Sequence, residues 1–221
     1  MPKTTIAEEL LLLCYDPGTG RPLVDSTRLT CGLVGAMVAD LALAGRLGID
    51  AERLYPLDGA PMGDPQLDGF AARVAAEPRP RKIKWWVTKV QNARLRKALL
   101  GGAVAHGVLT HQARRALGIF PMNDYRPAQP GQRDDLVLRL GSVLRQEHPA
   151  DSRSVALLAL CGAVRVDRKL FRELPQGERR RMIKAVMAGD EIGRAVKSVI
   201  QSIEAATAAA ASAGSAGAAG S

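Results

Sequence analysis

The sequence is poor in aromatic residues and in cysteine. Phe, Trp and Tyr make up 4% of the 221 residues, whereas apolar residues make up 47%. The core must therefore be built mostly from Leu, Val, Ile and Ala, and the abundance of Ala and Leu favours helix over sheet. The three cysteines, Cys14, Cys31 and Cys161, lie far apart in apolar runs. This pattern predicts buried thiols in a reducing compartment and not a disulfide framework.

Motifs for catalysis or metal binding are also missing. The chain contains no H-E-x-x-H, no Walker loop and no G-x-S-x-G. The histidines, His106, His111 and His148, are not spaced to share a metal with any cysteine. We therefore expect no catalysis, no metal and no cofactor. The start of the chain has no signal-peptide pattern, so we expect a cytoplasmic protein.

Length and hydrophobic patterning predict a mainly α fold, with a single helical-bundle domain over residues 1–204 and one or two short β-hairpins. The bundle is expected around a buried central helix, Leu29 to Gly45, in which Asp40 is the only charge. This run is shorter than the ~20 residues of a membrane span, and a central Asp would cost roughly 2.5–3.5 kcal/mol there. Residues 205–221 form an Ala/Ser/Gly-rich tail that we expect to be disordered.

Charge is distributed unevenly along the chain. Between Pro78 and Asn123 lie ten of the 31 Lys and Arg residues and none of the 22 acidic residues. The rest of the chain carries 21 basic and 22 acidic residues, so the formal net charge of +9 arises in this window. Such a segment creates a positive surface potential that attracts polyanions, which are anionic membranes or nucleic acids.

Two helices are expected in the basic window. Ile83, Trp86, Val87 and Val90 follow helical spacing, so we expect Trp86 to pack in the core, whereas Trp85 lies off this stripe. The second helix, from about Asn92 to Ala105, has three cations in its first two turns, where the helix dipole prefers anions. The cluster is explained if it meets phosphate, or it is an ordinary solvated face. The predicted headgroup-binding residues are Lys89, Arg94, Arg96 and Lys97.

A β-hairpin is predicted after this helix. Val108–Thr110 and Leu117–Phe120 are short apolar pieces on either side of His111–Arg115, and Pro121 is expected to close the hairpin. Apolar residues beside two arginines are able to enter a bilayer interface while the charges meet headgroups. A hairpin that only covers the core is the alternative. The residues predicted for membrane contact or self-association are Arg114, Arg115, Leu117, Ile119 and Phe120.

Several segments, taken in order, resemble the Golgi phosphoprotein 3 family, whose members also occur in bacteria of the actinomycete type. The segments are TIAEELLLL (5–13), CGLVGAMVADLALAGRLGI (31–49), LRKALLGGAVAHGVL (95–109) and RSVALLALC (153–161). Their order and spacing carry the resemblance, which spans residues 5 to 203. It implies a mostly helical domain with a protruding hairpin. In the eukaryotic members this domain is a peripheral membrane adaptor that binds phosphatidylinositol 4-phosphate and links coat machinery to the tails of client enzymes.

The headgroup pocket implied by the resemblance is only partly retained. It uses a Trp before the central helix, an Arg early in that helix, and two Arg three residues apart. The matching positions in this chain are Asp25, Val34, Ala93 and Arg96. Arg94 and Lys97 are possible substitutes, but a carboxylate at Asp25 would repel a phosphate. The basic window remains compatible with a looser affinity for anionic lipid, at ~1 kcal/mol for each well-placed Lys or Arg.

The leading hypothesis is therefore a peripheral, non-catalytic module that binds anionic lipid, with client proteins and self-association through the hairpin as further possibilities. An alternative is nucleic-acid binding, because a helix followed by Gly107 and a hairpin also fits a winged helix-turn-helix. The predicted helix loses polarity after Lys97, however, which argues against insertion into a groove. A second alternative is a scaffold whose basic window contacts an acidic protein.

Overall fold

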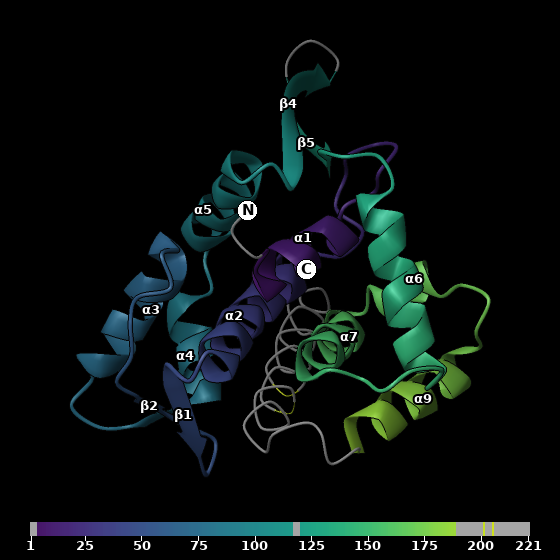
Figure 1. Ribbon diagram of the computed structural model, residues 1–221. Coiled ribbons are helices and arrows are strands. Elements are labelled where there is room, and N and C mark those ends of the chain that lie inside the picture. Colours follow the sequence, from purple (N-terminus) through teal and green to yellow (C-terminus); the bar gives the residue numbers. More distant parts are fainter. Residues whose placement is uncertain (1–3, 117–119, 189–200, 202–204, 206–221) are drawn as a thin grey trace, which may run out of the picture.

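The computed structural model describes residues 4–116, 120–188, 201 and 205 (Figure 1). Helices predominate in this part of the chain, which confirms the mainly α prediction. The helices are α1 (Ile6–Cys14), α2 (Ser26–Leu43), α3 (Pro65–Ala75), α4 (Ile83–Val90), α5 (Ala93–Ala105), α6 (Gln132–Leu144), α7 (Ser152–Val164), α8 (Asp167–Leu170) and α9 (Gln176–Ala188). The strands are β1 (Leu47–Asp50), β2 (Arg53–Pro56), β3 (Arg81–Lys82), β4 (Leu109–Ala116) and β5 (Phe120–Pro127).

Helix α2 is the helix predicted from the longest apolar run. It is the only helix in the described residues that is long and apolar enough to cross a membrane, but 72% of it is buried inside the protein. It packs against α1, α3, α4, α5 and α7. Helices α6, α8 and α9 pack mainly on α7 and on one another, so the helices do not all surround α2 (Figure 1).

Helix α1 starts at a capping box. The Thr5 side chain accepts a hydrogen bond from the Glu8 N–H, and the Glu8 carboxylate accepts one from the Thr5 N–H. All nine residues of α1 are buried, including Glu8 and Glu9. Burial of two carboxylates requires partners from other helices, because an unpaired buried charge is costly. These partners come from α5, α6 and α7.

Strands β1 and β2 form a short hairpin after α2, and β3 adds a third antiparallel strand. This small sheet fixes the start of α4, because the Ile83 N–H donates to the Glu52 carbonyl at 2.8 Å. The apolar stripe of α4 lies as predicted, with Ile83, Trp86, Val87 and Val90 all buried.

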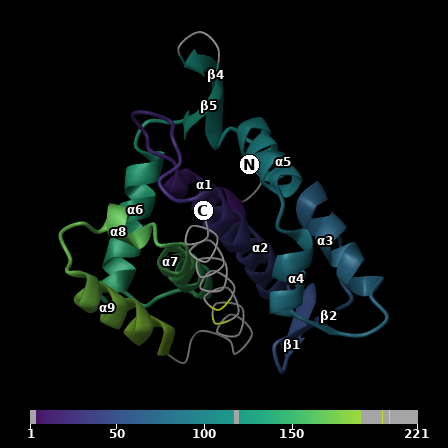
Figure 2. The same cartoon turned by 180° about the vertical axis from the view of Figure 1, so that it is seen from behind.

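The second hairpin, β4–β5, differs from the prediction in its strand boundaries. His111–Arg115, expected in the connection, lies within β4, and Pro121, expected to close the hairpin, pairs with Arg115 inside β5. The strands are eight residues each, so this hairpin is longer than expected. Thr110 to Arg114 are all exposed, so this part of the strand gives no alternating pattern. The hairpin projects from the helical body beside α5 and α6 (Figures 1 and 2).

Candidate site at the start of α2 and α5

The first two turns of α5 carry the predicted cation cluster. Asn92 caps the helix by accepting a hydrogen bond from the Leu95 N–H at 2.9 Å. Leu99, Leu100 and Ala103 are buried, which holds the second half of the helix in the core. The opposite side of the first two turns is thereby presented outward, with Arg94 and Lys97 exposed.

Arg96 connects α5 to the start of α2. Its guanidinium Nη1 donates to the carbonyl oxygen of Ser26 at 3.3 Å and to Oγ1 of Thr30 at 3.4 Å. Ser26 is the first residue of α2, so the N-terminal turns of the two helices lie against each other. Each helix N-terminus contributes a partial positive charge, and the cations of α5 add to it.

A carboxylate stands at this junction and is paired within its own helix. Asp25 caps α2 by accepting a hydrogen bond from the Arg28 N–H at 2.9 Å. Its second oxygen lies 3.4 Å from Nε of Arg28, with the two side chains 52% and 28% exposed. The ion pair offsets the negative charge of Asp25 and also occupies a cation that would otherwise be available to an anion.

Tyrosines lie near Arg96 at the base of the β4–β5 hairpin. Tyr15 and Tyr125 make an edge-to-face contact with ring centroids 5.3 Å apart, and His111 stacks on Tyr125 at 4.8 Å. Burial raises the pKa of Tyr15 to about 12, and the positive charge of Arg96 acts in the opposite direction. Burial also raises the pKa of Tyr125, again against Arg96. Both phenols are therefore neutral hydrogen-bonding groups within the electrostatic field of Arg96.

Lys89 lies on α4, the helix that precedes α5. Its ammonium is 5.5 Å from the ring centroid of Trp85, and the guanidinium of Arg81 is 5.1 Å from the same centroid. The predicted four-residue cluster is therefore divided between two helices. Arg94, Arg96 and Lys97 share the start of α5, whereas Lys89 belongs to the exposed side of α4.

Carboxylates neutralise part of the basic window. Arg81 pairs with Glu77 at 3.3 Å, Lys82 lies 3.8 Å from Glu52, and Arg114 pairs with the buried Asp124. Other cations of the window have no ion pair among the described residues: Arg79, Lys84, Lys89, Arg94, Arg96 and Lys97. The unpaired cations are therefore those of α4 and α5 together with Arg79.

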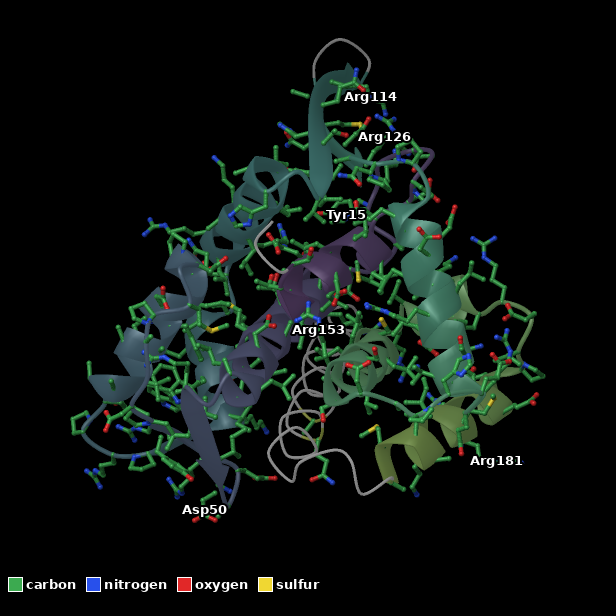
Figure 3. All side chains as sticks on the ribbon, in the orientation of Figure 1. Tyr15, Asp50, Arg114, Arg126, Arg153 and Arg181 are labelled. Carbon is green, nitrogen blue, oxygen red and sulfur yellow. The ribbon has the colours of Figure 1, made fainter. Side chains whose placement is uncertain are left out.

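The predicted hairpin residues are described only in part. Arg114 forms an ion pair with Asp124 on the adjacent strand (Figure 3). Arg115 and Phe120 occupy strand positions, but their side chains, together with Leu117 and Ile119, lie outside the described part of the chain. Their predicted contact with membrane or with a second copy stays a prediction.

Arg28, Tyr15 and Tyr125 lie at the junction but were not predicted from the sequence. Arg28 lies three residues after the Asp25 cap, and this spacing was a readable signal of pairing. Tyr15 and Tyr125 had no such signal, because the hairpin brings them together from distant parts of the sequence. Val34, which occupies the position of a pocket arginine, is fully buried in the core and cannot meet a headgroup.

Comparison with known families agrees with the resemblance in sequence. The family model of Golgi phosphoprotein 3 matches residues 6–203. The chain belongs to the Golgi phosphoprotein 3 family. No curated protein matches it. Within the described residues of this family member, no group of three His, Cys, Asp or Glu side chains is placed to hold a metal ion.

Proposed function

We propose that this Golgi phosphoprotein 3 family member is a peripheral, non-catalytic module that binds anionic lipid headgroups at the junction of α2 and α5. The observation that carries the proposal is the contact of Arg96 with Ser26 and Thr30. It places the starts of two helices together beside cations that have no carboxylate partner in the described residues. Phosphate groups are the natural ligands of such an arrangement.

The proposed affinity is for anionic lipid in general. Of the implied pocket positions, Val34 is buried and Asp25 is a carboxylate. Arg28 supplies a cation at the start of α2, but this cation is paired with Asp25. Arg94 and Lys97 are exposed, so they are suited to attract a charged membrane surface and not to enclose a single headgroup in a pocket.

Co-sedimentation with vesicles tests the proposal. We expect binding to phosphatidylcholine vesicles to grow with the fraction of phosphatidylglycerol and to weaken as salt is added. Arg94→Glu combined with Lys97→Glu should lower the affinity by about tenfold or more, since each well-placed cation contributes ~1 kcal/mol. Vesicles with phosphatidylinositol 4-phosphate at equal surface charge should bind no better than phosphatidylglycerol vesicles.

A matched control is available on the other side of the molecule. Arg168 of α8 and Arg181 of α9 are exposed, and α9 lies across the helical body from α5 (Figure 3). Arg168→Glu with Arg181→Glu makes the same change in net charge and should lower vesicle affinity much less. If neither type of anionic vesicle retains the protein at low salt, the proposal is wrong. Retention of duplex DNA in place of vesicles would favour the nucleic-acid alternative.

A further inference from the structure

Trp85 has an environment unlike that of its neighbour Trp86. Trp86 is 2% exposed and packs edge-to-face on Phe70, with centroids 5.4 Å apart. Trp85 is half-buried: it packs against the edge of the core and makes an edge-to-face contact with Trp86, with ring centroids 4.9 Å apart at 88°. Helical spacing therefore directs one indole into the core and leaves the other at the surface of α4.

Trp85 of α4 lies between two cations, one from β3 and one from α4. Arg81, Trp85 and Lys89 follow one another at intervals of four residues, and both cations lie over the indole ring. Arg81 also pairs with Glu77, whereas Lys89 and Lys84 have no ion pair in the described residues. This stripe of Arg81, Trp85 and Lys89 thus combines an amphipathic ring with long cationic side chains that have apolar stems.

This combination fits a lipid interface better than a nucleic acid. A base that stacked on Trp85 would have to displace the cations that already lie over the ring. A bilayer needs no free ring face, because indole sits at the headgroup level with its apolar body toward the acyl chains. Lys and Arg beside it then extend toward the phosphates while their stems stay in the apolar zone.

We propose that α4 is a membrane-contact element in which Trp85 enters the interface between Arg81 and Lys89. The inference rests on the proposed lipid binding. It adds that the residue entering the bilayer interface is Trp85, which lies outside the α2–α5 junction. Lys84 and Lys89 supply charge to the bilayer surface, and Trp85 supplies apolar contact. The β3 strand and the Ile83–Glu52 hydrogen bond hold the start of α4, so the stripe is presented on a fixed element.

Intrinsic fluorescence provides the test, because Trp85 and Trp86 are the only two tryptophans. In the Trp86→Phe variant, emission comes from Trp85 alone. This variant also removes an indole N–H that has no hydrogen-bond partner among the described residues. We expect vesicles of phosphatidylcholine and phosphatidylglycerol with brominated acyl chains to quench Trp85 and shift its emission to shorter wavelength. The matched Trp85→Phe variant, which reports the buried Trp86, should show clearly weaker quenching.

The outcomes separate the two proposals. Co-sedimentation of the protein with unquenched Trp85 would overturn this inference and leave the lipid-binding proposal intact. No co-sedimentation at low salt would overturn both. Quenching of Trp85 by single-stranded DNA but not by brominated vesicles would overturn the inference in favour of base stacking. If Trp86→Phe does not fold, the wild type and Trp85→Phe are compared, and equal quenching of the two contradicts the inference.

Affinity supplies a second measurement. Trp85→Ala should weaken binding to the same vesicles by about tenfold, because it removes apolar area from the interface. Thr88→Ala, on the exposed side of the same helix, is the control and should leave the affinity unchanged within about twofold. Equal effects of the two substitutions would contradict the inference.

Discussion

Asp40 of α2 accepts a hydrogen bond of 2.8 Å from the main-chain N–H of Ile6, the first residue of α1. The same carboxylate lies 3.3 Å from the guanidinium of Arg153, which also binds Glu9 at 2.8 Å and the Thr4 carbonyl (Figure 3). Arg153 comes from α7, so one buried network joins the start of α1 to α2 and α7. The only charge of the apolar α2 run therefore has a structural role.

Arg153→Met should destabilise the protein strongly. The substitution leaves Asp40, which is 5% exposed, without its cation, whereas Glu9, which is 8% exposed, keeps Arg139. Removing one partner of a buried ion pair costs about 3–5 kcal/mol, because the remaining charge is uncompensated. Urea unfolding followed by circular dichroism measures the loss as a lower midpoint at unchanged slope.

Arg139→Met is the control for this substitution. Arg139 binds the same Glu9 at 2.7 Å, but its side chain is 48% exposed. Solvent screening limits such a pair to about 1 kcal/mol or less. If the two substitutions cost the same, the network is not buried in the manner described.

The protonation of Asp40 should make stability depend on pH. Burial raises the pKa of Asp40 to about 6, against the opposing effects of the Ile6 N–H and Arg153. In the unfolded chain the carboxyl titrates near about 3.9, so between these values the folded protein binds more protons than the unfolded chain. The contribution of Asp40 to the free energy of unfolding therefore rises as pH falls through 6 toward 4.

Asp40→Asn isolates this contribution. As pH is lowered from about 7 to about 4, the stability of the wild type relative to the variant should increase by at most about 3 kcal/mol. Urea midpoints at several pH values give this difference. A constant difference across the range, or one that favours the variant at low pH, would contradict the assignment.

Helices were predictable from sequence because their signals are local. The Thr5–Glu8 capping box and the spacing of Ile83, Trp86 and Val90 need only a few neighbouring residues. The β4–β5 hairpin was misplaced because it projects from the body and because the exposed run Thr110–Arg114 of β4 gives no alternating pattern. Pro121 was read as a closing residue, yet a two-stranded hairpin consists of edge strands, which tolerate proline.

The sequence predicted which cations the candidate site contains, but not how they are arranged. The cations of α5 were visible as a cluster, but the contact of Arg96 with Ser26 joins residues 70 positions apart. No periodic pattern reports such a contact. The division of Lys89 from Arg96 depends likewise on how α4 and α5 turn relative to each other at Gln91 and Asn92.

Gly20→Ala should loosen the attachment of the hairpin to the α1–α2 loop. Gly20 has a φ of +72°, and an added Cβ would lie 2.6 Å from Cβ of Asp124. The Tyr125 N–H donates to the Gly20 carbonyl at 2.9 Å, so the loop and β5 cannot separate without breaking this hydrogen bond. We expect a cost of about 3 kcal/mol from backbone strain and overlap together.

Gly45→Ala, at a φ of +67° with nothing within 4 Å, should cost only about 1 kcal/mol. Equal costs in urea unfolding would show that Asp124 does not restrict this position.

Asp25→Asn should strengthen binding to anionic vesicles. Asn caps a helix as well as Asp does, so the start of α2 is kept, while Arg28 loses the carboxylate 3.4 Å away. Releasing one cation and removing one repulsive charge should raise the affinity for phosphatidylglycerol vesicles about fivefold at low salt, with less effect as salt is added. Asp151→Asn makes the same change at the cap of α7, where the Asp side chain accepts from the Ser154 N–H, and should leave binding unchanged within about twofold. Both variants have the same net charge, so a gain in affinity confined to Asp25→Asn can only arise at the start of α2. An equal gain in both variants would mean that overall charge, and not this junction, governs attraction to the membrane.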